Sequence, residues 1–238
     1  MRLDKLIETK LHTTRKEMKR LFLMKRVTVD NEVELKPQRN VDSQLHHIVV
    51  DGQNLQTDQV YYLLNKPKGV VTAKQDNHCQ TVLDLIDAKD WRQELYPVGR
   101  LDRDTTGLLL LTDNGQLGYD LLQPKEKVAK TYRAVVNERV TEEDATAFAR
   151  GIIFHGGIVC QPAELKILFA SEKASMVDLT IHEGKFHQVK KMFLACGKKV
   201  VDLQRLKMGP LSLPNDLAIG SYRALTLDEL QLLKKYFR

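Results

Sequence analysis

Four consecutive leucines, Leu108 to Leu111, form the longest unbroken aliphatic run in this chain. A short apolar run with polar residues on both sides is typical of a strand that is buried on both faces. The segment directly before it, from Gly99 to Gly107, carries two aspartates and two arginines. A carboxylate at the mouth of a buried strand is costly to desolvate unless a cation pairs with it. The arginines of the same segment are candidates for that cation.

The two aspartates of this segment allow two interpretations. In the first, Asp102 or Asp104 stabilises a turn by bonding its own backbone, as short segments rich in Asp, Thr and Gly often do. In the second, one of them is a functional carboxylate. The order Gly-Arg-Leu-Asp-Arg-Asp-Thr-Thr-Gly-Leu-Leu-Leu-Leu-Thr, residues 99–112, resembles the signature of the RNA pseudouridine synthases, in the branch that acts on ribosomal RNA. The resemblance implies that Asp102 is the essential carboxylate and that Asp104 supports the turn.

The first 26 residues are strongly basic, with nine lysines and arginines against three acids, and their net charge of +6 equals that of the whole protein. Apolar residues at helical spacing predict one helix near residues 3–11 and a second that begins at Thr14, where Thr-Arg-Lys-Glu matches a capping box. Residues 27–33 predict a hairpin that turns at Asp30 and Asn31. Such a charge cluster is either a solvated face or a clamp for RNA phosphates.

This order of two basic helices and a hairpin resembles the S4 RNA-binding domain, which this branch of the family usually carries at its N-terminus. From residue 27 to residue 58 the balance reverses, with two basic residues against six acids and a net charge of −4. Gln53 to Gln59 is polar and has no apolar period, so it is interpreted as a linker. We therefore expect an S4-like RNA-binding domain over residues 1–58 and a catalytic domain over residues 59–238.

The second domain is expected to open with a strand at Tyr61 to Leu64 that ends in the basic turn Lys-Pro-Lys-Gly, residues 66–69. A later strand, residues 129–136, contains Tyr132. A tyrosine in a strand is most often core, whereas the resemblance implies that this ring lies against the target base. Local patterns and caps predict further helices at residues 82–86, 115–122 and 141–150 and a last one that starts at Thr226.

A second segment that resembles the family is Glu-Gly-Lys-Phe-His-Gln-Val-Lys-Lys-Met, residues 183–192. Val189, Met192 and Phe193 fall on one helical stripe, which puts Lys190 at the edge of that buried stripe and Lys191 away from it. Lys190 can therefore reach a neighbouring carboxylate. In the family a basic residue of this segment, often arginine, pairs with the essential aspartate, and Lys190 is the match. Lysine supplies a point charge where arginine supplies a planar, two-pronged partner.

The charge pattern and the resemblance together nominate a set of residues for RNA binding. They are Arg2, Lys5, Arg15, Lys16, Lys19, Arg20, Lys25, Arg26, Lys66, Lys68, Arg100, Arg103, Lys185, His187, Gln188 and Lys191. No metal-ligand spacing and no glycine-rich nucleotide loop is present, so no metal and no other cofactor is expected. Three scattered cysteines, no leader sequence and no long apolar run favour a cytoplasmic protein without membrane association. No coiled-coil pattern occurs, and a monomer is expected.

The fold implied by the resemblance is α+β, with a small N-terminal S4-like domain and a larger domain built on a mixed, mainly antiparallel sheet with flanking helices. The implied activity is isomerisation of a uridine in ribosomal RNA to pseudouridine, with Asp102, Tyr132 and Lys190 at the site. The opening residues, residues 95–102 and the segment Leu-Lys-Met-Gly-Pro-Leu look most like family members that act on 16S RNA, with a small-subunit assembly intermediate as the expected partner.

Three alternatives remain open at this level. Family members that act on large-subunit (23S) RNA share the main motifs. A non-catalytic S4-type ribosomal RNA-binding factor would use the second domain for recognition alone. A metal-dependent hydrolase would use Asp102 and Asp104 together.

Overall fold

A computed structural model describes residues 1–154 and 156–237 of the chain. It divides into two compact units. Unit 1 comprises Met1–Tyr62, Thr112–Leu121 and the residues from Ala224 on, and unit 2 comprises Leu63–Leu111 and Leu122–Arg223. These are not the two continuous stretches expected as domains, because two later segments join the N-terminal one. The boundary at residue 58, as the edge of an S4-like domain, remains a prediction.

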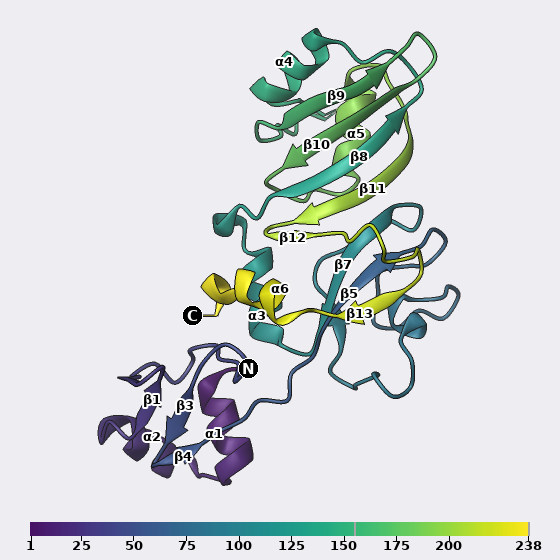
Figure 1. The fold of residues 1–238 in the computed structure, drawn as a ribbon. Helices are drawn as coiled ribbons and strands as arrows, with labels where there is room; N and C mark the ends of the chain where they lie inside the picture. Colours follow the sequence, from purple (N-terminus) through teal and green to yellow (C-terminus); the bar gives the residue numbers. More distant parts are fainter. Residues whose placement is uncertain (155, 238) are drawn as a thin grey trace. The chain divides into compact units, whose positions relative to one another are not determined.

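Unit 1 begins with two helices and a small antiparallel sheet (Figure 1). These elements are α1 (Leu3–Leu11), α2 (Arg15–Leu23), β1 (Val27–Val29), β2 (Glu32–Val33), β3 (Ile48–Val50) and β4 (Gln53–Asn54). The strands lie in the order β2-β1-β3-β4. Both helices and the hairpin were expected from the sequence, and all three are confirmed.

Local chemistry explains two of these elements. The Thr14 side chain accepts a hydrogen bond from the Glu17 amide, and the Glu17 carboxylate accepts one from the Thr14 amide, which completes the capping box of α2. In the β1–β2 turn, Asp30 and Asn31 have φ values of 55° and 68°. Positive φ at both central residues is what a type I′ hairpin turn requires, and Asp and Asn tolerate it better than other side chains.

The N-terminal segment has a hydrophobic core of its own. It consists of Leu3, Leu6, Ile7, Phe22, Val27, Val29, Val41, Ile48, Val50 and Leu55. The linker prediction for Gln53 to Gln59 is therefore wrong at its start. Gln53 and Asn54 form β4 against β3, and Leu55 is only 6% exposed because it packs into this core.

Unit 1 also contains three helical pieces from later in the chain: α3 (Gly115–Leu122), α6 (Leu227–Leu232) and η3 (Lys234–Tyr236). The Asn114 side chain accepts from the Leu117 amide at the start of α3, and Thr226 forms a capping box with Glu229 at the start of α6. Both helix starts were predicted from these residues. The Phe237 ring packs edge-on against the Tyr61 ring, with centroids 6.3 Å apart.

Unit 2 holds nearly all of a nine-stranded sheet within the described residues. Its strands are β5 (Tyr61–Lys66), β6 (Tyr96–Pro97), β7 (Thr106–Thr112), β8 (Lys130–Val136), β9 (Glu164–Ala170), β10 (Ser175–Ile181), β11 (Val200–Met208), β12 (Leu211–Ser212) and β13 (Tyr222–Ala224). The order is β13-β5-β7-β11-β8-β10-β9, with β12 beside β11 and β6 beside β7. β8 pairs antiparallel with both β10 and β11, and β10 pairs antiparallel with β9, whereas β7 and β11 run parallel.

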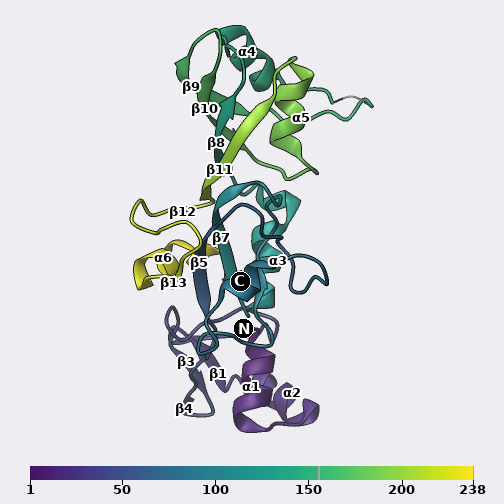
Figure 2. The same cartoon turned by 90° about the vertical axis from the view of Figure 1, so that its right-hand side faces the viewer.

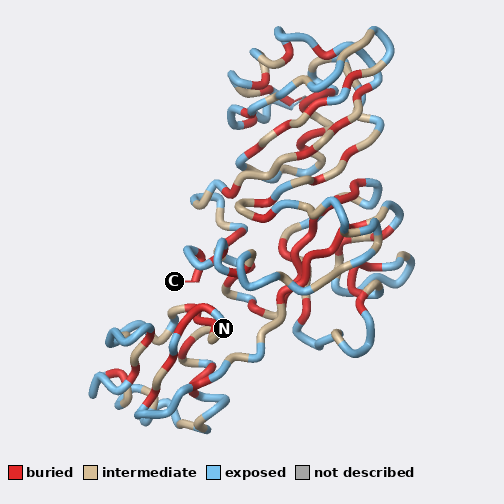
Figure 3. The backbone as a smooth tube through the Cα atoms, viewed as in Figure 1, coloured by how far each residue is buried: buried red, intermediate tan, exposed pale blue. Residues whose placement is uncertain are grey.

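The helices of unit 2 pack on this sheet. The two longer ones, α4 (Glu142–Arg150) and α5 (Gln188–Ala195), contact β9 and β11 respectively (Figure 2). Phe148 of α4 and Phe193 of α5 are both fully buried, with ring centroids 4.9 Å apart. Two short 3₁₀ helices, η1 (Val82–Leu85) and η2 (Pro124–Glu126), complete the set. In Figure 3 the strands β5 and β7 are buried, and for β7 the leucine run predicted this.

The α+β fold with a mixed, mainly antiparallel sheet is confirmed. No helix in the described part of the chain is long and apolar enough to cross a membrane.

Candidate active site

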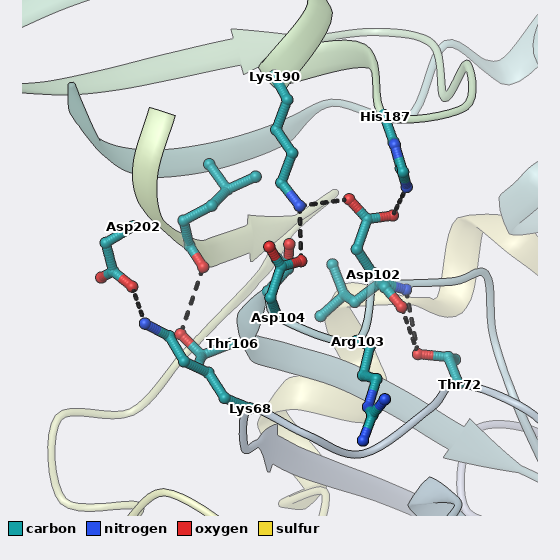
Figure 4. Close-up of polar contacts among 12 residues, drawn as sticks. Lys68, Thr72, Asp102, Arg103, Asp104, Thr106, His187, Lys190 and Asp202 are labelled. Atoms are coloured by element: carbon teal, nitrogen blue, oxygen red, sulfur yellow. Dashed lines mark hydrogen bonds and ion pairs between the residues drawn. The ribbon is translucent and has the colours of Figure 1, made fainter. Parts of the chain in front are cut away.

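The segment before β7, residues 99–105, forms a short loop, here called the acid loop. Its two aspartates are accessible to solvent. All seven residues of β7, from Thr106 to Thr112, are buried. Asp102, four residues before the strand, keeps 27% of its side chain exposed, and Asp104 keeps 70%. The strand thus anchors the loop, while the carboxylate of Asp102 stays within reach of a bound molecule (Figure 4).

Lys190 of α5 points into this loop and contacts both acids. Its Nζ lies 3.1 Å from Asp102 Oδ2 and 2.6 Å from Asp104 Oδ1. Figure 4 shows the lysine side chain extending from the helix between the two carboxylates. The helical spacing that put Lys190 at the edge of the buried stripe, within reach of a carboxylate, is confirmed.

These contacts set the charge states of the group. Partial burial disfavours the charged form of Lys190, but its hydrogen bonds to Asp104 and Asp102 outweigh that effect, so the pKa of Lys190 is raised above its usual value. The hydrogen bond from Lys190 lowers the pKa of Asp104. The lysine therefore remains an ammonium across the physiological range.

Asp104 takes a larger part in this site than the sequence indicated. The resemblance assigned it to support of the turn, yet its carboxylate makes the shorter of the two contacts with Lys190. His187 is the third neighbour, with Nε2 3.5 Å from Asp102 Oδ1. Asp102 thus faces a lysine on one side and a histidine on the other, both from the second motif.

The basic turn at residues 66–69 is docked on the acid loop through backbone groups. The Gly69 amide donates to the Arg103 carbonyl at 2.8 Å, and the Arg103 Nε donates back to the Gly69 carbonyl at 3.0 Å. Thr72 bonds both backbone groups of Leu101, donating to its carbonyl and accepting from its amide. Backbone hydrogen bonds therefore hold the basic turn and the acid loop together.

Lys66 lies inside this unit and corrects one of our predictions. The residue was expected to bind RNA, but it is completely buried. Its Nζ donates to the carbonyls of Pro67, Arg103 and Thr105 at 2.9, 3.4 and 3.1 Å. Desolvation lowers its pKa to about 8, although the nearby acids partly oppose the shift. Lys66 therefore holds the acid loop from within.

Tyr132 lies on β8, in the same sheet as the strand that follows the acid loop. It is 8% exposed and lies opposite Arg205 of β11, which is itself opposite Gly107 of β7. Two strand spacings, about 10 Å, separate the backbones of Tyr132 and Gly107. A Cβ atom at Gly107 would collide with the Arg205 backbone, so glycine is required where the two strands approach. Tyr132 and Gly107 therefore lie at the same level of the sheet, on either side of Arg205. The role of Tyr132 against the target base remains a prediction.

Two other residues that were expected to bind RNA, Gln188 and Lys185, make contacts within the protein. Gln188 is 4% exposed, donates to Glu183 and accepts from the Lys185 amide, which corrects its assignment to RNA binding. Lys185 forms an ion pair with Glu183.

The remaining candidates are accessible. In unit 2 these are Lys68, Arg100, Arg103, His187 and Lys191, none of which is buried. In unit 1 Arg15, Lys16, Lys19, Arg20 and Lys25 are exposed, whereas Arg2, Lys5 and Arg26 pair with Asp4, Glu8 and Asp51. Among the described residues, no group of three or more His, Cys, Asp or Glu side chains is arranged to hold a metal ion.

Comparison with known proteins identifies the family. The model of the RNA pseudouridylate synthase family matches residues 60–195. A Vibrio cholerae protein named ribosomal small subunit pseudouridine synthase A is 41% identical over 242 residues, covering 99% of this chain and all of the relative. The Escherichia coli K12 protein of the same name is 39% identical over 237 residues, covering 97% of this chain and 98% of the relative. An uncharacterized RNA pseudouridine synthase from Bacillus subtilis is 40% identical over 99% of both chains.

A crystal structure of a pseudouridylate synthase also matches, with a TM-score of 0.69 and 36% identity over 98% of this chain and 99% of that one. The fold of this chain therefore has a counterpart in a solved pseudouridylate synthase. The chain belongs to the RNA pseudouridylate synthase family and is an isomerase that acts on RNA.

Proposed function

We propose that this protein isomerises a specific uridine of small-subunit (16S) ribosomal RNA to pseudouridine, with Asp102 as the essential carboxylate. The observation that carries the proposal is the contact of Lys190 with Asp102, which joins the two motifs in one site. The relatives from Vibrio cholerae and Escherichia coli, both named for the small subunit, support the choice of RNA. A monomer in the cytoplasm, acting on a small-subunit assembly intermediate, completes the proposal.

In this reaction the bond between the ribose and the uracil nitrogen breaks, the base turns, and a bond from the ribose to a uracil carbon forms. That carbon then loses its proton and the uracil nitrogen freed from the ribose gains one, so the product is an isomer of the substrate. Asp102 acts at the ribose, either by adding to it or by taking a proton from it. Both routes use the Asp102 carboxylate, whose Oδ2 lies 3.1 Å from the Lys190 ammonium.

The target base has to leave its stack to reach Asp102, at a cost of a few kcal/mol. In our proposal Tyr132 lies against the extruded base and offsets part of that cost, since an aromatic face replaces a lost stacking partner. The exposed basic residues of α2 and its flanks bind phosphates through counterion release, as an S4-like domain would.

The test is an Asp102→Asn variant assayed on ribosomal RNA. We expect it to bind RNA as the wild type does and to form no pseudouridine, because the amide can neither add to the ribose nor accept a proton from it. Retained turnover would reject the role of Asp102. A non-catalytic RNA-binding factor predicts instead that the wild type itself forms no pseudouridine in any ribosomal RNA.

Pseudouridine mapping in cells that lack the protein distinguishes the two RNA subunits. We expect one 16S position to lose its pseudouridine and to regain it when the wild-type gene, but not the Asp102→Asn gene, is restored. Loss of a 23S position instead would assign the protein to the large subunit.

A further inference from the structure

An exposed aromatic ring lies beside the acid loop, on the turn that leads into α5. Phe186 is 73% exposed, the highest value among the large apolar residues that the structure describes. Its ring stacks on that of His187, with centroids 3.8 Å apart and planes inclined by 21°. His187 in turn lies 3.5 Å from Asp102. The two rings therefore form one surface that starts at the essential acid and extends into solvent.

The turn that carries these rings is held in place. Gln188 is buried, its Oε1 accepts from the Lys185 amide at 2.9 Å, and its Nε2 donates to Glu183 at 2.7 Å. Lys185 and Glu183 are themselves an ion pair. Hydrogen bonds and an ion pair thus fix the turn around Phe186. The ring is therefore exposed because the turn holds it in solvent.

His187 has a left-handed backbone, with φ at 54°. Positive φ is uncommon for residues other than glycine, although histidine, like asparagine and aspartate, adopts it more readily than most side chains do. In this turn the conformation accompanies a stacked pair of rings next to Asp102.

Positive charge borders the exposed ring. The Lys191 ammonium lies over the Phe186 ring, 4.9 Å from its centroid, so a base that stacks on this ring takes the place of the ammonium. Lys190 of the same helix contacts Asp102. An aromatic face next to ammonium groups is the combination that binds single-stranded nucleic acid, because the cations meet phosphates while the bases stack on the ring.

We propose that Phe186, backed by His187, is a stacking subsite for the nucleotide base next to the target uridine. When the uridine is extruded toward Asp102, its neighbour loses a stacking partner, and the exposed ring replaces that partner. Lys191 then neutralises the phosphate between the two nucleotides. This inference rests on the family's action on uridine in RNA and is independent of which ribosomal subunit supplies the RNA.

The first experiment measures RNA affinity for substitutions at Phe186. The probe is a synthetic RNA built around the uridine that the wild type modifies, and each variant also carries Asp102→Asn so that the RNA is not converted. We expect Phe186→Ala to raise Kd about 5- to 150-fold. Phe186→Tyr and Phe186→Trp should bind as the parent does, because they keep a stacking face, whereas Phe186→Leu should resemble the alanine variant.

The matched control is Phe169→Ala. Phe169 is also an exposed phenylalanine of unit 2, at 58%, and it lies on β9, far along the sheet order from β7. We expect this variant to bind RNA with unchanged affinity. If Phe169→Ala loses as much affinity as Phe186→Ala, the effect is general and the subsite is rejected.

The second experiment separates direct stacking from a shift of His187. Removal of the flanking base, as an abasic nucleotide on one side of the target uridine, should weaken binding to the parent by the same factor as Phe186→Ala. The alanine variant should then show no further loss with the abasic RNA, as a double-mutant cycle requires of two partners in contact.

Besides a loss of affinity in the Phe169→Ala control, three results would overturn the proposal. They are wild-type affinity in Phe186→Ala, wild-type affinity in Phe186→Leu, and an abasic penalty on both sides of the uridine that is undiminished in Phe186→Ala. Steady-state kinetics with Asp102 intact give a further test. We expect KM to rise in Phe186→Ala while kcat changes little. If the target proves to be another RNA than small-subunit RNA, only the sequence of the probe changes. The comparison of Phe186 variants with the parent is made in the same way.

Discussion

Two lysines meet the loop that carries Asp102, and their surroundings differ in almost every respect. Lys190 arrives from α5, is 25% exposed in its side chain, and faces two carboxylates. Lys66 arrives from β5, is fully buried, and donates to three backbone carbonyls. The pKa of Lys190 is raised, and that of Lys66 is lowered to about 8. The comparison shows that the partners of each lysine decide its role. Lys190, which faces carboxylates, supplies a positive charge to the site, whereas Lys66, which faces backbone carbonyls, fixes the conformation of the loop.

The largest effect should come from removing the charge of Lys190. Lys190→Met keeps the apolar stem but leaves Asp102 and Asp104 without their ammonium, and we expect kcat to fall about 100- to 1000-fold. Single-turnover conversion of ribosomal RNA measures the loss. Lys190→Arg restores a cation and should lose less than about tenfold, since the two side chains differ in geometry. A fully active methionine variant would show that the contact is structural only.

Removal of Lys66 should act on folding instead. Lys66→Met removes the donor from the carbonyls of Pro67 and Thr105, whereas the Arg103 carbonyl keeps the Gly69 amide. This loss should lower the free energy of unfolding by about 2–3 kcal/mol. Urea denaturation measures the change. Lys68→Met is the control, because Lys68 is exposed and pairs with Asp202 at the surface, and it should change stability by less than about 0.5 kcal/mol. Equal losses in both variants would contradict the role given to Lys66.

The pH dependence of stability should separate the two lysines. The folded chain holds Lys66 with a pKa of about 8 against 10.5 for the free side chain, so between these values the unfolded chain binds more protons. Stability therefore rises with pH in this window, and the wild type should gain about 2 kcal/mol over Lys66→Met between pH 8 and pH 10. Urea midpoints of both proteins at the two pH values measure this gain. A constant difference between them would mean that Lys66 does not titrate in that range.

The sign is opposite for Lys190. Because its pKa is raised in the folded chain, its contribution to stability is complete below 10.5 and is lost as the pH rises above that value.

The smallest effect should follow from Asp104→Asn. Its carboxylate is 70% exposed, so solvent screens its attraction to Lys190 despite the short contact. We expect kcat/KM to fall less than about tenfold, with Lys190 left to Asp102 alone. A loss as complete as that of Asp102→Asn would make Asp104 a second essential acid.

The features that could be predicted from the sequence are those set by neighbours along the chain. The cap at Thr14, the turn at Asp30 and Asn31 and the edge position of Lys190 on its helix each depend on residues within a few positions. The buried fate of Lys66 and Gln188 could not be predicted in the same way. Their partners come from a separate loop or from the bend of their own turn, and lysine and glutamine are usually exposed.

The sequence by itself determined the class of enzyme, the strand that follows the acid loop and the identity of Asp102 and Lys190 as candidate partners. Only the tertiary structure decided that Lys190 is shared between two acids, that Lys66 holds their loop from inside, and that Phe186 remains exposed beside them. The physical reason is that hydrogen-bond partners and burial depend on segments far apart in the chain, whereas helix periodicity and caps are local.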